Sequence, residues 1–198
     1  MKSLHLIYVP GLGDQNVSSQ QWAVNTWHRY GVTAELVQMN WASGDWEPKL
    51  ERILTSIDAA VHDGKAVGLV GASAGASAVI NAYAARRESV VGVVLIAGKV
   101  NRPETVGHGY KSKNPAFWTS INQCQLSLAK LDDSDRKRIL SRRGLLDEVV
   151  LPADNIIPKA HNHRVPSIGH VITISTQLLF GAPSFIRFLR KQAALITA

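Results

Sequence analysis

The sequence of 198 residues contains a single cysteine, Cys124, which excludes a disulfide within the chain. One unpaired thiol suits a reducing compartment, so we expect a cytoplasmic protein in which this side chain is a small, partly buried apolar residue. The sequence also lacks any apolar run near the roughly 20 residues of a membrane-spanning helix, and no membrane span is expected. No internal repeat and no low-complexity segment is present, which excludes a repeat array.

Charge of one sign is not concentrated in any segment. The formal net charge is +7, but the basic residues are spread over the chain in small clusters. No nucleic-acid-binding motif accompanies them, so a solvated basic surface is expected and a nucleic-acid partner is not. The hydrophobic fraction of 45% and the length are those of one globular domain with a substantial core, and we predict a single domain over residues 1–198.

Apolar segments of strand length alternate with segments of helical periodicity along the whole chain. This order predicts an α/β fold with about six mostly parallel strands in one sheet and helices on both faces. Ser18 or Ser19 is expected to cap the first helix, and Asp45 the second. The expected strands are 4–9, 33–39, 67–70, 90–97, 138–143 and 161–168, and the expected helices are 18–30, 48–62, 74–87 and one near the carboxyl terminus. Residues 99–137 are less regular and are expected to form a loop region or small cap with one or two helices.

The most informative motif is Gly71-Ala72-Ser73-Ala74-Gly75, which reads G-x-S-x-G. It follows an apolar strand segment and opens a helical one, the context of a nucleophile elbow. There a serine adopts a strained backbone conformation, which requires tiny residues two positions before and after it. Glycine stands at both positions, so Ser73 is the candidate nucleophile.

A serine nucleophile needs a histidine base, and the histidine needs a carboxylate. His170 is the best placed histidine, because it follows Gly169 in the loop after the last predicted strand. His161 and His163 also lie nearby, but no carboxylate or cysteine stands at ligand spacing. We therefore predict neither a metal site nor a cofactor.

Three acidic residues compete for the role of the carboxylate. Between Asp147 and His170 lie 22 residues, enough for the chain to cross over and form another strand, whereas only 15 residues lie between Asp154 and His170. This spacing favours Asp147 over Asp154, and Glu148 comes third. The oxyanion hole is expected from the backbone N–H of Ala74 and from the glycine-flanked loop after the first strand, where Leu12 is the candidate.

Taken in order, these motifs resemble those of the α/β-hydrolase superfamily over essentially the whole chain. Pro10-Gly11-Leu12-Gly13 is similar to its oxyanion loop, Gly71–Gly75 to its nucleophile elbow, and Asp147 and His170 to its acid and base. Within the superfamily the chain resembles compact bacterial esterases and lipases that lack a large lid. It departs from many relatives in having Pro10 and Ala72 where they have histidine, and neither change removes a required catalytic group.

The resemblance implies a serine hydrolase that cleaves carboxylic esters through an acyl-enzyme. Thioesterase, lactonase and acyltransferase activities use the same groups and stay open, as does a binding protein that kept the fold without turnover. The expected partner is a small-molecule ester, and Phe117 and Trp118 are candidates for an apolar acyl pocket or for ordinary packing. The sequence leaves the oligomeric state undetermined.

Overall fold

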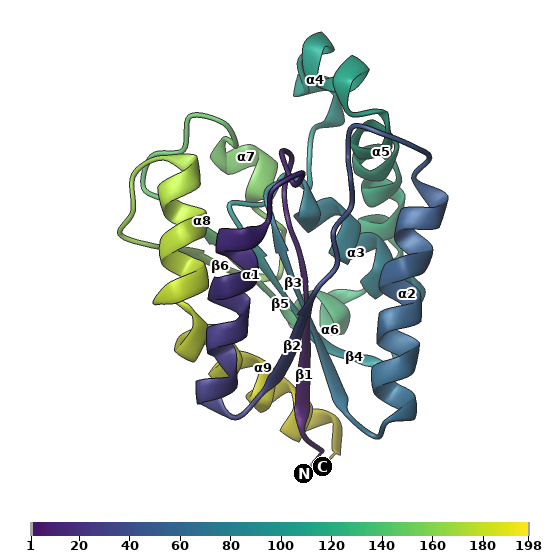
Figure 1. Cartoon of the computed structure of the whole chain (residues 1–198), viewed down its shortest axis with the longest axis vertical. Coiled ribbons are helices and arrows are strands. Elements are labelled where there is room, and N and C mark those ends of the chain that lie inside the picture. Colours follow the sequence, from purple (N-terminus) through teal and green to yellow (C-terminus); the bar gives the residue numbers. More distant parts are fainter. Residues whose placement is uncertain (1, 198) are drawn as a thin grey trace.

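Six strands form one parallel sheet in the computed structural model, which describes residues 2–197 (Figure 1). The strand order is β2-β1-β3-β4-β5-β6, and every neighbouring pair runs parallel. The strands are β1 (Leu4–Val9), β2 (Thr33–Leu36), β3 (Ala66–Ala72), β4 (Val90–Ile96), β5 (Ile139–Arg143) and β6 (His161–Arg164). The prediction of a six-stranded α/β sheet is confirmed.

Helices cover both faces of the sheet. On one face lie α1 (Ser18–Asn25), α8 (His170–Leu179) and α9 (Ala182–Thr197), and on the other α2 (Glu47–His62), α3 (Gly75–Ala85) and α5 (Pro115–Lys130) (Figure 1). The shorter elements are η1 (Thr26–Tyr30), η2 (Pro103–Thr105), α4 (His108–Lys113), α6 (Asp133–Arg136) and α7 (Pro152–Asn155). No single helix within residues 2–197 has the length and apolar character to cross a membrane. Helices α8 and α9 meet both criteria only when taken as a pair, and the pair is bent by 66°.

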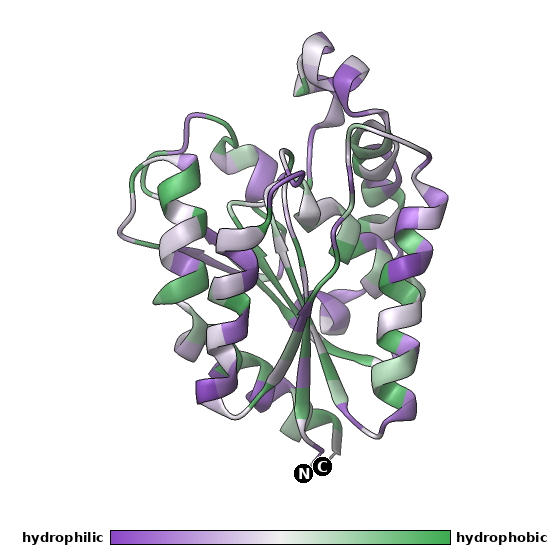
Figure 2. Ribbon diagram, viewed as in Figure 1, coloured by the Kyte–Doolittle hydropathy of each residue, from purple (hydrophilic) through white to green (hydrophobic). Residues whose placement is uncertain are grey.

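The burial of each strand follows its place in the sheet. Every residue of the central strands β3 and β4 is buried, because helices pack on both of their faces. The edge strands are more polar and less buried: β2 is mostly half-buried, and β6 is mostly exposed. Figure 2 shows the apolar residues gathered along the central strands and the helix faces that meet them. Two hydrophobic clusters result, one on each side of the sheet.

Several predicted boundaries were wrong. The second strand ends at Leu36 rather than residue 39, because the backbone N–H of Met39 turns away to the Asp14 carboxylate. The last strand ends at Arg164 rather than residue 168. Pro166 follows two residues later and has no N–H for the ladder, and Ile168 forms only an isolated bridge.

The predicted helix caps were also wrong. Helix α2 begins after Trp46, with no side-chain cap from Asp45, and Pro48 in its first turn supplies the preset backbone angle. Ser18 is the first residue of α1 rather than its cap, and its N–H instead donates to the side chain of Asn16.

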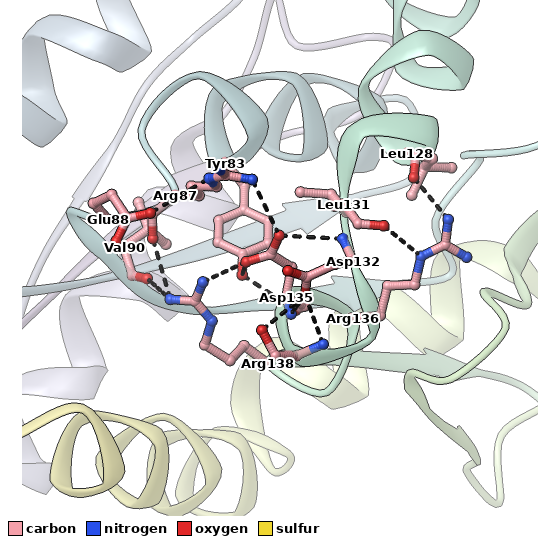
Figure 3. Close-up of polar contacts among 11 residues, drawn as sticks. Tyr83, Arg87, Glu88, Val90, Leu128, Leu131, Asp132, Asp135, Arg136 and Arg138 are labelled. Carbon is pink, nitrogen blue, oxygen red and sulfur yellow. Dashed lines mark hydrogen bonds and ion pairs between the residues drawn. The ribbon is translucent and has the colours of Figure 1, made fainter. Parts of the chain in front are cut away.

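A polar network on α6 secures the start of β5, away from the carboxyl ends of the strands (Figure 3). Asp135 and Asp132 form a reciprocal capping box, and the guanidinium of Arg138 donates to Asp135 at 2.6 Å. The Tyr83 hydroxyl donates to the backbone carbonyl of Asp135 at 3.1 Å, and Arg87 lies 3.7 Å from its carboxylate. The buried Asp135 carboxylate is thus neutralised, and it ties α6 to α3 and β5.

Candidate active site

Ser73 lies in the sharp turn between β3 and α3, with a φ of 52° in the left-handed region. The turn is possible because the residues two positions before and after Ser73 are glycines, which carry no side chain. A Cβ on Gly71 would lie 2.6 Å from the carbonyl oxygen of Gly75, and one on Gly75 would collide with the carbonyl of Val9. The strain of this turn presents the Ser73 hydroxyl at the carboxyl edge of the sheet, as the motif predicts.

The structure brings Ser73, His170 and Asp147 into one chain of hydrogen bonds. Nδ1 of His170 lies 2.8 Å from Oδ2 of Asp147, and its Nε2 lies 2.9 Å from Oγ of Ser73. Because an ionised carboxylate only accepts, Nδ1 carries the proton, and Nε2 therefore accepts from the Ser73 hydroxyl. The backbone N–H groups of Val149 and Val150 donate to Oδ1 of Asp147 at 2.9 and 2.8 Å and fix the carboxylate.

Burial and backbone geometry hold the imidazole in place. The side chains of His170 and Asp147 are only 8% and 4% exposed, whereas Ser73 is half-buried. Gly169, with a φ of 90°, lets the chain turn into α8, so His170 is the first residue of that helix. The backbone N–H of His170, which has no acceptor within the helix, donates to the Glu148 carboxylate at 3.1 Å. This contact places a negative charge at the N-terminus of α8.

The other two acidic candidates have different partners. Asp154 is buried and lies 2.7 Å from Nζ of Lys99 and 2.8 Å from Nε of Arg102. Burial alone would raise the pKa of Asp154, but hydrogen bonds from Arg102 and Lys99 outweigh it and hold that pKa below its usual range. Glu148 binds the backbone of His170 rather than its ring. Only Asp147 of the three contacts the imidazole.

The loop after β1 passes directly beside the serine. A Cβ on Gly11 would lie 2.7 Å from Cβ of Ser73, so only glycine permits this approach. Leu12 and Ala74 line the same cavity as Ser73. Within residues 2–197, neither the Leu12 nor the Ala74 backbone N–H donates a hydrogen bond, which leaves both donors available.

Asp14 is a positioning residue that the sequence reasoning missed. Its carboxylate is fully buried and accepts the backbone N–H groups of Met39 and Asn40 at 2.7 and 2.8 Å. The Trp41 indole donates to the carbonyl of Pro10 at 3.2 Å. These bonds tie the loop after β1 to the segment after β2. The signal available in the sequence was an acidic residue at the end of the glycine-rich loop. A carboxylate that becomes buried there needs several hydrogen-bond donors, and it can obtain them from the backbone of a neighbouring segment.

A cavity of about 270 Å³ opens beside Ser73. Most of its walls come from the segment before α5, from the first turn of α5 and from the loop between β5 and α7. They include Val106, Tyr110, Phe117, Val149, Val150 and Leu151, with Lys99, Glu148 and Asp154 as the charged members. Phe117 therefore lines the cavity, as one reading of the sequence predicted. Trp118 does not: its ring lies under Nζ of Lys111, 3.9 Å from the ring centroid.

The remaining histidines of this region lie apart from the serine. His161 packs against the Phe188 ring, with the ring centroids 5.4 Å apart, and His163 is exposed on the edge strand. The described part of the chain, residues 2–197, contains no cluster of three or more His, Cys, Asp or Glu side chains able to hold a metal ion.

Comparison with solved structures identifies the fold. The chain aligns with a structure of the metagenome-derived lipolytic enzymes LipS and LipT at a TM-score of 0.70 and 14% identity, over 100% of this chain and 95% of the other. Est1E from Butyrivibrio proteoclasticus aligns at 0.70 and 16% identity, over 98% and 89%. The ydeN gene product of B. subtilis aligns at 0.64 and 16% identity, over 97% and 100%.

These neighbours and the sheet order define the class: the chain has the α/β-hydrolase fold, and that prediction is confirmed. The alignments run over nearly the full length of both partners, so this is a compact member of the fold. No family model matches the sequence, and no curated protein is significantly similar to it.

Proposed function

We propose that this protein is a serine hydrolase that cleaves carboxylic esters through an acyl-enzyme. Ser73 is the nucleophile, His170 the general base and Asp147 the residue that orients His170. The observation that carries the proposal is the unbroken chain of hydrogen bonds from the Ser73 hydroxyl to the Asp147 carboxylate. The lipolytic enzymes and esterases among the structural neighbours support it.

In the acylation step, Oγ of Ser73 attacks the ester carbonyl carbon while its proton passes to Nε2 of His170. The imidazolium formed is stabilised by Asp147, which stays ionised. Nε2 then gives the proton to the oxygen of the leaving alcohol as the carbon–oxygen bond breaks. The acyl group remains on Ser73.

In the deacylation step, water takes the place of the alcohol. His170 accepts a proton from the water as its oxygen attacks the acyl carbon, and then returns that proton to Ser73 as the acid leaves. One imidazole thus acts as base and acid in both halves of the reaction, and no cofactor is required.

The oxyanion of each tetrahedral intermediate is assigned to the backbone N–H groups of Leu12 and Ala74. Both residues border the cavity beside Ser73, and Ala74 opens the first turn of α3, where N–H groups are free and the helix dipole favours negative charge. One such donor contributes about 10²–10³-fold to kcat in enzymes of this type.

Small acyl groups fit the cavity best. A volume of about 270 Å³ lies just below the roughly 300–1,000 Å³ of pockets that enclose drug-sized ligands. Its walls are largely apolar, so short aliphatic acyl chains match it in size and in polarity. We expect p-nitrophenyl acetate and butyrate to be cleaved with higher kcat/KM than the dodecanoate.

The test is labelling of the protein by a fluorophosphonate probe, together with turnover of p-nitrophenyl acetate and butyrate. Wild type should be labelled and active. Ser73→Ala should lose labelling. His170→Ala should lose nearly all turnover, because no base is then left to take the proton of the Ser73 hydroxyl.

Matched controls are Ser112→Ala and His62→Ala, which change the same residue types at exposed positions outside the cavity. Both should behave as wild type. A folded wild-type protein that is neither labelled nor active would overturn the proposal, as would undiminished labelling of Ser73→Ala.

A further inference from the structure

A second cleft, of about 410 Å³, lies at the β6 edge of the sheet, between the ends of β5 and β6 and the junction of α8 and α9. None of the residues that line it borders the cavity beside Ser73. Its wall is mostly polar and carries basic side chains. The residues used below are Arg142, His163, Arg164, Gln177, Phe180 and Ser184.

Arg142 in this cleft is a buried cation with no carboxylate partner among residues 2–197. It is only 6% exposed. Its guanidinium donates to the side-chain oxygen of Gln177 at 2.8 Å, to the carbonyl of Gly181 at 3.2 Å and to the Ser184 hydroxyl at 2.6 Å. All three acceptors are neutral, and the buried Nε has no hydrogen-bond partner. A buried charge with only neutral partners is costly in free energy unless an opposite charge balances it.

The other two buried cations of the described chain, Lys99 and Lys49, have acids nearby, although the pKa of Lys49 is still lowered overall. Lys99 lies 2.7 Å from the buried Asp154 carboxylate. Asp14 and Asp45 raise the pKa of Lys49 against the lowering effect of its burial. For Arg142, burial lowers the pKa, and no carboxylate in the described part of the chain opposes it. In this respect Arg142 differs from the other two.

The surroundings of Arg142 add positive charge. On the neighbouring strand, His163 pairs in register with Arg142, Arg164 follows it, and both line the cleft. Helix α9 begins at Ala182, so the positive end of its dipole borders the cleft. The end of α8 opposes this with a partial negative charge of about one half, which is less than the guanidinium charge. None of the described residues lining the cleft is acidic.

We propose that this cleft binds a phosphate group, with Arg142 as the buried anchor and His163 and Arg164 as contacts at the rim. Two guanidinium N–H groups of Arg142 remain free of the three contacts above, one on Nε and one on Nη2. Nε is enclosed by protein, so the phosphate is assigned to the Nη2 side of the guanidinium, where its charge would balance the cation. The group belongs either to a small phosphate or phosphate monoester, or to a lipid headgroup. Phe180, 79% exposed at the cleft, could lie against lipid chains.

The experiment measures phosphate binding by the full chain. Isothermal titration with inorganic phosphate and with glycerol 3-phosphate, at constant ionic strength, tests the soluble ligands. Flotation with phosphatidylglycerol vesicles, against phosphatidylcholine vesicles, tests the headgroup. Saturable binding in either arm, weakened about tenfold or more by Arg164→Gln and by His163→Gln, is the expected result, because each substitution removes a phosphate contact. The arm that responds identifies the source.

Arg29→Gln is the matched control, since Arg29 is an exposed arginine on the same face of the sheet but outside the cleft. It should bind as wild type does. Equal weakening by Arg29→Gln and Arg164→Gln would mean unspecific attraction to a basic surface and would overturn the proposal. So would the absence of binding in both arms. Arg142→Gln should abolish binding; if it fails to fold, the two rim variants decide the question.

Discussion

Replacing Gly11 with alanine tests whether the loop after β1 contributes to catalysis. The added Cβ would lie 2.7 Å from Cβ of Ser73 and 3.2 Å from the carbonyl oxygen of Ala72. Ordinary contact begins at 3.4 Å, so the loop must withdraw from the serine by about 0.7 Å. The backbone angle of Gly11 is not in the left-handed region, so alanine adds no torsional strain there.

The displacement predicts a large loss of rate and a moderate loss of stability. A misplacement of about 1 Å costs roughly 10²-fold in rate, and loss of one oxyanion donor costs about 10²–10³-fold. We therefore expect kcat for p-nitrophenyl butyrate to fall about 10²-fold in Gly11→Ala. Overpacking of this size costs about 1–3 kcal/mol, less than the usual free energy of unfolding of a domain, so the variant should fold.

The assay compares kcat, KM and thermal unfolding of Gly11→Ala with those of wild type and Gly109→Ala. Gly109 is a fair control because a Cβ there meets nothing within 4 Å. It should match wild type in all three quantities. A folded Gly11→Ala protein with an unchanged kcat would refute the assignment of the oxyanion donor to this loop.

The remaining predictions concern the two competing aspartates and the cysteine. Asp147→Asn should lower kcat by roughly 10³–10⁴-fold with little change in stability, because the amide cannot hold the imidazole in the required tautomer. Asp154→Asn should instead cost about 3–5 kcal/mol in free energy of unfolding, because it leaves Lys99 unbalanced in the interior. Since the pKa of Asp154 is lowered on folding, this difference should be complete above about pH 5 and shrink as pH falls through the folded pKa. A reversal of the two phenotypes, read from kinetics and denaturant titrations across pH, would contradict both assignments. Burial raises the pKa of the Cys124 thiol, so Ellman's reagent should react with it only after unfolding; rapid reaction of the native protein would disprove this.

Much of the architecture was readable from local patterns. The alternation of apolar strands with amphipathic helices predicted six parallel strands, because parallel neighbours require crossover connections. Element ends were less predictable. The β2 boundary depends on the Asp14 carboxylate, which captures backbone N–H groups that the strand would otherwise use. That contact joins residues 25 positions apart, and no local pattern signals it.

The candidate site likewise has one part that local sequence patterns predicted and one part that they did not. Gly71, Ser73 and Gly75 lie within five consecutive residues, and the strain of their turn is a local property, so the sequence alone predicts the sharp turn at Ser73. The spacing before His170 favoured Asp147, but it could not tell which carboxylate reaches the imidazole. That choice rests on a separation of 2.8 Å, whereas Asp154 lies against Lys99.

By itself the sequence determined the fold class and the order of the candidate groups along the chain, since both follow from short-range periodicity and turn chemistry. Only the tertiary structure decided which groups meet: Asp147 with His170, Asp14 with the segment after β2, and Arg142 with three neutral acceptors. Burial sets the partners of a charged side chain, and burial depends on how distant elements pack against one another.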